Sequence, residues 1–164
     1  MVSRLIYILK FIILTIIFLF IAIVQNNLLL IGINGNLVPD ISIFIIFYLF
    51  FVDGSISYFG VFLLCIMFDV INMLPTCVTA ISTLIACKVI EAILSKTVLN
   101  IKKNMPIIFL IYFLVYNIIE LFIMMYLYDR YFIPLFVNPI INFFGFIAFK
   151  YVMEYIHNLV GREN

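Results

Sequence analysis

The sequence predicts an all-α integral membrane protein with six transmembrane helices, and three observations support this fold class. Hydrophobic residues make up 68% of the 164 residues and charged residues only 10%, whereas a soluble domain is about 45–50% apolar. The apolar residues form long runs of the kind that cross a bilayer as helices. These runs are apolar on every face, which excludes the alternating pattern of membrane β-strands. No segment has a water-soluble composition over the length of a domain, so we expect residues 1–164 to form a single polytopic membrane domain.

The first predicted span follows Arg4 and Lys10 and continues to Val24. It is long enough to cross about 30 Å, and residues 25–27 contain no small-residue cleavage site. We therefore expect a retained helix and not a signal peptide. Residues 28–37 are apolar but are interrupted by glycine and asparagine, so we expect them at the outer interface of the membrane.

The second predicted span, Ile41 to Val52, is opened by Pro39 and Asp40, and Asp40 is suited to cap the helix. Its twelve apolar residues are few for a span that rises 1.5 Å per residue. Residues 37–38 extend this apolar run toward a sufficient length.

The third and fourth predicted spans lie on either side of a break in the apolar pattern. The third, Ile56 to Ile71, follows a turn at residues 53–55 that is too tight for anything but an antiparallel pair. The fourth, Thr76 to Leu94, begins directly after Pro75, a residue that suits the first turn of a helix.

The fifth and sixth predicted spans complete the set. The fifth runs from Ile107 to Leu127 and is closed by residues 128–131, which include two interfacial tyrosines. Asn138 is expected to cap the last helix and Pro139 to occupy its first position, so this span should end near His157.

The distribution of charge orients the six spans. When both termini are placed in the cytoplasm, Arg130 is the basic residue that remains outside. Seven basic residues then lie inside: Arg4, Lys10, Lys96, Lys102, Lys103, Lys150 and Arg162. The positive-inside rule favours this topology, and we expect a multi-pass protein with cytoplasmic termini.

Polar residues inside the spans are sparse. Asn117 lies at the middle of the fifth span, and Glu120 follows it on the same helical face, with no second acidic residue expected at that depth. A functional role must be considered for any buried ionisable group. We favour a hydrogen-bonded pin between helices over an ion pathway. Lys88 and Glu91, three residues apart, are expected to pair locally while Lys88 extends toward the cytoplasmic side.

Small residues form one stripe on the fourth span. They follow the i, i+3, i+4, i+7 spacing and comprise Thr76, Thr79, Ala80, Thr83, Ala86 and Cys87. Such a stripe allows two membrane helices to approach closely. The spacing leaves open whether the neighbouring helix belongs to this chain or to a partner.

The third span carries the acidic residue that we consider most informative. Asp69 shares a face with Cys65, whereas Gly60 points the opposite way, so this helix is expected to pack on both sides. Asp69 should cap or hydrogen-bond the break at residues 72–75, and the alternative is a contact with a partner.

The sequence shows no catalytic set. The order Asp53, Gly54 and Asp69 faintly resembles phosphatidyltransferases that use CDP-alcohols, but their signature needs clustered aspartates with an Ala-Arg pair, which this chain lacks. It also lacks a Ser/His/Asp set, a glycine-rich phosphate loop and a metal cluster, and its three cysteines lie in apolar runs. We expect no enzyme activity, no cofactor, no metal and no nucleic-acid partner.

Three features follow one another along the chain: Pro39-Asp40 followed by the apolar run Ile41 to Phe51, the glycines Gly54 and Gly60, and the segment Phe62 to Ile71 that contains Asp69. In their order and spacing, and in the length of six spans, the chain resembles the rod shape-determining protein MreD family over nearly its whole length. Cys65 stands where the family often has glycine, and Pro75-Thr76 replaces the usual turn. These two departures concern close packing at those positions.

This resemblance implies a non-enzymatic component of the bacterial cell-elongation machinery in the inner membrane. MreD-like proteins bind the single-span protein MreC, and thereby support the MreB cytoskeleton and the peptidoglycan synthases. Their fold is similar to the substrate-binding subunits of energy-coupling vitamin transporters. A membrane subunit of such a transporter is therefore the alternative, and it should carry a polar ligand pocket near Asp40 and Asp69 at the outer face.

Overall fold

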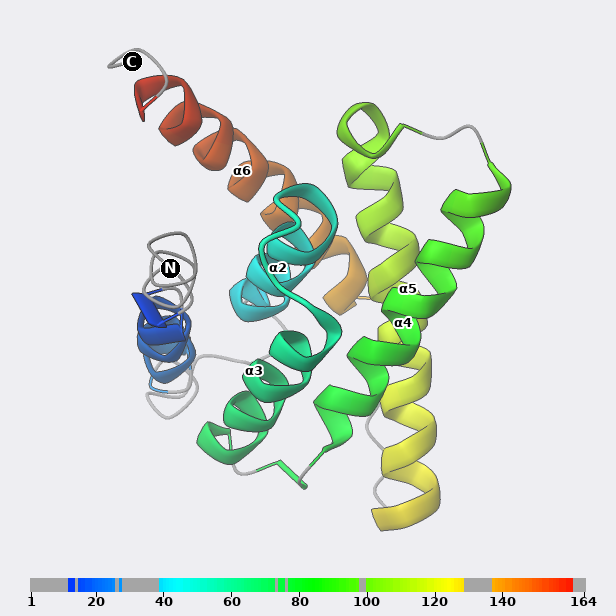
Figure 1. Ribbon diagram of the computed structural model, residues 1–164. Coiled ribbons are helices and arrows are strands. Elements are labelled where there is room, and N and C mark those ends of the chain that lie inside the picture. The colour runs from blue at the N-terminus through cyan, green and yellow to red at the C-terminus, as the bar shows by residue number, and fades with distance from the viewer. Residues whose placement is uncertain are drawn as a thin grey trace, which may run out of the picture.

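The structure is a computed structural model that describes residues 12–13, 15–25, 27, 39–72, 74–75, 77–97, 100–128 and 137–160. Within these ranges every regular element is a helix (Figure 1). An N-terminal helix, Thr15–Gln25, is followed by α2 (Ile41–Phe47), η2 (Tyr48–Val52), α3 (Tyr58–Ile71), α4 (Val78–Lys96), α5 (Ile101–Tyr128) and α6 (Val137–Val160). The all-helical fold class is therefore confirmed for the described part of the chain.

Two stretches in the described residues are long and apolar enough to cross a membrane. They are Val78–Lys96, which is α4, and Lys103–Tyr126 within α5. Three further apolar helices are shorter: Thr15–Gln25, Ile41–Val52 and Tyr58–Ile71. The structure thus supports membrane-spanning helices, while the number of crossings stays a prediction of the sequence.

The start of α3 is fixed by a cap that the sequence analysis does not include. The hydroxyl oxygen of Ser57 accepts a hydrogen bond from the N–H of Gly60 at 3.4 Å, and Ser57 itself is extended. Such a cap satisfies one of the free N–H groups of the first helical turn. The chain reverses direction between η2 and this cap. Gly54 lies in that reversal with a positive φ of 63°, a conformation that glycine adopts easily because it has no Cβ.

The start of α4 differs from the prediction. Cys77 has a left-handed backbone with φ 72°, and the helix begins at Val78. Pro75 lies before this turn and accepts a hydrogen bond from the N–H of Val78 at 3.2 Å. The expectation that Pro75 occupies the first helical turn is therefore wrong, because the chain makes one more turn before the helix starts.

The last two helices begin earlier than the apolar pattern indicates. α5 starts at Ile101 and is kinked at Asn104, whose φ and ψ are −106° and 18°, two residues before Pro106. A proline inside a helix lacks the N–H that would continue the hydrogen-bond ladder. α6 starts at Val137, so Pro139 is its third residue and not its first, as the sequence predicts.

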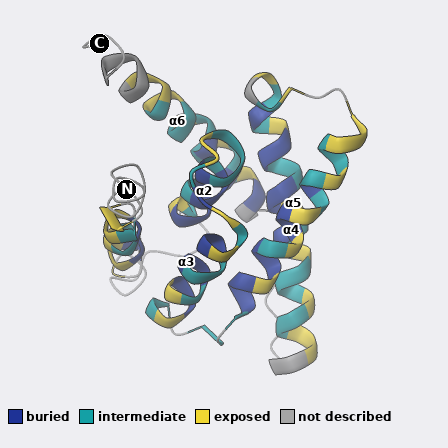
Figure 2. Ribbon diagram, viewed as in Figure 1, coloured by how far each residue is buried: buried dark blue, intermediate teal, exposed yellow. Residues whose placement is uncertain are grey.

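The core holds the helices together through aromatic side chains. α4 packs against both α3 and α5, and α6 packs against α5 and α2 (Figure 1). Phe109 of α5 stacks on Phe146 of α6 with ring centroids 3.9 Å apart, and Phe44 and Phe47 of α2 meet both rings edge-on. The buried residues face inward and the exposed ones outward around this centre (Figure 2).

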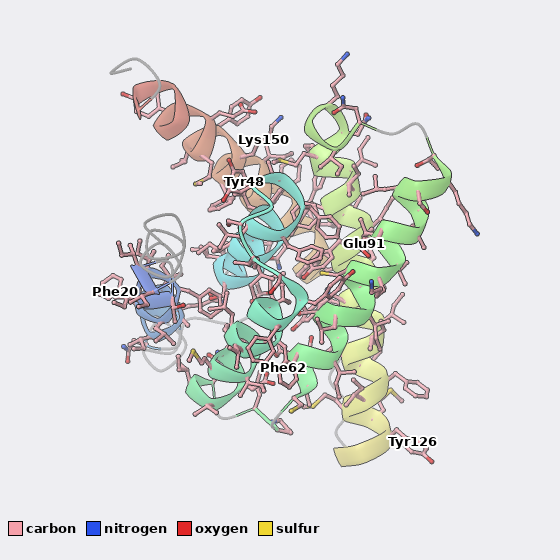
Figure 3. The ribbon with its side chains drawn as sticks, in the orientation of Figure 1. Phe20, Tyr48, Phe62, Glu91, Tyr126 and Lys150 are labelled. Carbon is pink, nitrogen blue, oxygen red and sulfur yellow. The ribbon has the colours of Figure 1, made fainter. Side chains whose placement is uncertain are left out.

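The links between consecutive helices alternate between the two ends of the bundle (Figure 1). The link between α4 and α5 lies at the same end as the C-terminal half of α6, whereas the link between α3 and α4 lies at the other end with the close of α5 (Figure 1). Lys150 marks the first end and Tyr126 the second (Figure 3). This alternation fits the predicted antiparallel order of spans.

Candidate functional site

Buried polar side chains lie at several of the contacts between helices. Within the described residues the fully or nearly fully buried polar residues are Gln25, Ser42, Asp69, Thr79, Ser82, Thr83 and Asn142. A polar group in an apolar interior is costly unless it is hydrogen-bonded. Two aspartates, Asp40 and Asp69, organise most of the hydrogen bonds between different helices.

Asp40 joins three separate parts of the chain. Its Oδ1 accepts a hydrogen bond from Gln25 Nε2 at 3.1 Å, and its Oδ2 accepts one from Asn142 Nδ2 at 3.4 Å. The backbone N–H of Asp40 donates to Asn142 Oδ1 at 2.6 Å. The N-terminal helix and α6 are thus tied to the start of α2.

The expectation that the Asp40 side chain caps α2 is wrong. This side chain makes no capping hydrogen bond, although the backbone carbonyl of Asp40 accepts the N–H of Phe44 at 3.2 Å. The carboxylate turns instead to the amides of two other helices. Because Asn142 lies 102 residues away in sequence, this contact could not be read from local spacing.

Asp69 links the end of α3 to the start of α4. It is fully buried, and its Oδ1 accepts a hydrogen bond from the N–H of Thr79 at 3.3 Å. Its backbone carbonyl accepts the N–H of Leu74 at 2.9 Å. The prediction that Asp69 hydrogen-bonds around the break after α3 is confirmed. A partner cannot reach the buried carboxylate without opening the bundle.

The small-residue stripe of α4 is an internal packing face. Its described members are all fully buried: Thr79, Ala80, Thr83, Ala86 and Cys87. Thr76, the first member, lies outside the described residues. Gly60 on α3 is buried as well. Since α3 and α5 both pack against α4, the neighbours that the sequence leaves open belong to this chain.

Asn117 and Glu120 differ in the groups with which they interact. Asn117 Nδ2 donates to the carbonyl of Phe113 at 2.7 Å, one turn earlier in α5, so this bond does not pin one helix to another. Glu120 is partly buried, and the Tyr116 hydroxyl lies in hydrogen-bonding reach. Asp40 and Asp69 also act electrostatically on Glu120, which was not predicted because the three acids come from distant parts of the chain.

The ion pair Lys88–Glu91 is present and faces outward. Lys88 Nζ lies 3.1 Å from Glu91 Oε2, and it also lies 4.1 Å from the centre of the Tyr58 ring of α3. The two charged side chains are 65% and 42% exposed (Figure 3 labels Glu91). The pair therefore sits on the outer surface of α4.

The two amide residues that bind Asp40 were not among the residues predicted from the sequence. Gln25 ends an apolar helix and Asn142 lies in the mainly apolar first half of α6, and polar residues at such positions commonly hydrogen-bond between membrane helices. That signal could have singled them out, although not their common partner. In the described residues no group of three or more His, Cys, Asp or Glu side chains is arranged to hold a metal ion.

Comparison with protein-family models, with curated proteins and with solved structures finds no match to this chain.

Proposed function

We propose that this chain is a non-enzymatic membrane scaffold of the MreD type, which acts in the bacterial cell-elongation machinery. The observation that carries the proposal is the position of the two motif aspartates on which the resemblance rests. Asp40 and Asp69 are both engaged in holding helices together. Residues of this kind stabilise a fixed helical frame, as a scaffold requires.

The outer faces of the bundle support a location in lipid. The exposed large side chains of α5 between residues 107 and 126 are all hydrophobic: Ile107, Leu114, Ile118, Phe122, Met125 and Tyr126. Exposed apolar surface on this scale is rare in soluble monomers. We place the chain in the inner membrane, with several spans and with both termini in the cytoplasm.

The proposed partner is an MreC-like protein with a single span, through which the chain would act on MreB and the peptidoglycan synthases. The small-residue stripe of α4 is buried inside the bundle, so it does not contact the partner directly. It supports the packing of the helices that would. The partner helix is therefore expected on an exposed face. Close van der Waals contact and interhelical hydrogen bonds, worth about 0.6–2 kcal/mol each, would hold it there.

A second candidate is the substrate-binding subunit of a small-molecule transporter. One observation favours it: several buried oxygens on different helices lack a hydrogen-bond partner within the described part of the chain. They are Gln25 Oε1, Asp69 Oδ2, Thr79 Oγ1 and Thr83 Oγ1. A polar ligand that entered between the helices would find acceptors and hydroxyl groups there.

Co-purification separates the two candidates. The tagged chain and an MreC-like protein are expressed together, extracted in detergent and isolated through the tag. The scaffold proposal predicts that the partner is retained, and that it is lost when its single span is replaced by an unrelated apolar helix. Failure to retain the partner, together with a tightly bound vitamin-like molecule detected by mass spectrometry, would replace the scaffold with the transporter subunit.

A further inference from the structure

One face of α4 carries a charged pair midway along a helix that is long enough to cross a membrane. Apart from Lys96 at its end, the exposed residues of this helix follow one another at alternating steps of four and three: Ile81, Ile85, Lys88, Ala92 and Ser95. This is the spacing of a seam between two parallel helices that cross at a small angle. Glu91, the ion-pair partner of Lys88, borders this seam.

Contact with lipid alone would be energetically unfavourable for this face, because it carries a charged pair. Charged side chains inside a bilayer are costly and normally face a bundle interior, a cavity or another polar group. Yet Lys88 is 65% exposed, although it contacts both Glu91 and the Tyr58 ring. By contrast, the exposed large residues of α5 are hydrophobic throughout the stretch from residue 107 to 126.

We propose that this face of α4 is a dimerisation surface, and that its occupant is α4 of a second copy of the same chain. A second copy presents a Lys88 and a Glu91 that are complementary in charge to those of the first. Two copies inserted with the same topology can be related by a two-fold axis along the membrane normal, which makes their α4 helices parallel. Lys88 of one copy then lies about 4.5 Å along the axis from Glu91 of the other, since three residues rise 1.5 Å each.

That offset lies within the reach of a lysine side chain, so the two ion pairs can be exchanged across the axis. Each Lys88 then contacts the Glu91 of both copies, and the four charges neutralise one another away from lipid. Ile81 and Ile85 would pack on one side of this charged layer. Ala92 and Ser95 are small and let the two backbones approach closely on the other side.

Disulfide cross-linking tests the geometry of this surface. The three native cysteines are replaced by alanine, and Ile85→Cys is introduced into the full chain in membranes that contain no MreC-like protein. The dimer predicts that oxidation traps a covalent pair at position 85. Ile118→Cys on the exposed face of α5 is the matched control and should remain largely monomeric.

Charge exchange tests the proposed contact. The association constant in detergent, measured by light scattering after size exclusion, should fall at least ten-fold for Lys88→Glu. It should recover in the double variant Lys88→Glu/Glu91→Lys. Lys103→Glu, a charge reversal at an exposed position of α5, should leave association unchanged.

The proposal goes beyond the scaffold function, and the two can fail separately, because no other protein is present in this experiment. A wild-type chain that is monomeric and does not cross-link at position 85 would overturn it. The proposal would also be overturned if Lys88→Glu left the association constant unchanged, or if the double variant Lys88→Glu/Glu91→Lys did not recover it. Should Lys88→Glu prevent folding, the comparison of cross-linking at positions 85 and 118 still decides.

Discussion

A methyl group added at Gly145 should destabilise the bundle by a predictable amount. A Cβ at this position would lie 2.9 Å from the Pro39 Cβ and 3.2 Å from two ring atoms of Phe44. Carbon atoms normally pack about 3.5–4.0 Å apart, so the new atom overlaps both neighbours. The Cβ of Pro39 is part of a ring closed on the backbone, and Phe44 is held edge-on against the stacked rings of Phe109 and Phe146. Neither neighbour can move easily.

Overpacking of this kind typically costs about 1–3 kcal/mol. For a chain of this size each kcal/mol lowers the melting temperature by about 2–4 °C, so Gly145→Ala should melt about 2–12 °C below the wild type. The assay is the amount of monodisperse protein left after heating in detergent. Ala148→Val, at an exposed position of the same helix, is the control and should change little. Equal melting of Gly145→Ala and the wild type would refute the close approach of α6 to α2.

Substitutions at three further positions can be tested with the same melting assay. Asp69→Asn keeps an acceptor for the N–H of Thr79 and should be mild, whereas Asp69→Ala should cost about 0.5–2 kcal/mol; the reverse order would exclude a capping role. Thr83→Leu should destabilise by about 1–3 kcal/mol because its site is fully buried, while Ile118→Leu on the exposed face of α5 should be tolerated; equal effects would place Thr83 on the surface. Asp40→Ala should cost about 1–3 kcal/mol because it strips two amides of their acceptor, and an unchanged melting point would contradict the contacts with Gln25 and Asn142.

The sequence was sufficient to predict the helices but not all their ends. Apolar runs fixed the existence of α3, α4 and α5, because period and hydrophobicity are averaged over many residues. The ends of helices depend on single hydrogen bonds and on the backbone angles of single residues. The left-handed backbone of Cys77 and the kink at Asn104 are such local features, and an apolar pattern does not predict them. The Ser57 cap was not predicted either, although a serine before an apolar run is a known start signal that could have moved the predicted start from Ile56 to Tyr58.

The candidate site divides in the same way. The pair Lys88–Glu91 was predictable because both residues lie on one helix at a fixed spacing, and Asp69 because it precedes a break. The contact between Asp40 and Asn142 was not predictable, because the two residues lie 102 positions apart and meet only in the tertiary structure. Whether the stripe of α4 faces inward also depends on tertiary packing, since an internal helix and a partner helix demand the same small residues.

The central claim is that the chain crosses the membrane six times with both ends in the cytoplasm, and cysteine labelling tests it most directly. In a background without the native cysteines, Asn100→Cys probes the link between α4 and α5, and Leu74→Cys probes the link between α3 and α4. A membrane-impermeant maleimide is applied to intact cells and to permeabilised cells. The proposed topology predicts that Leu74→Cys is labelled in intact cells and Asn100→Cys only after permeabilisation. Labelling of Asn100→Cys in intact cells would contradict the topology and, with it, the proposed scaffold.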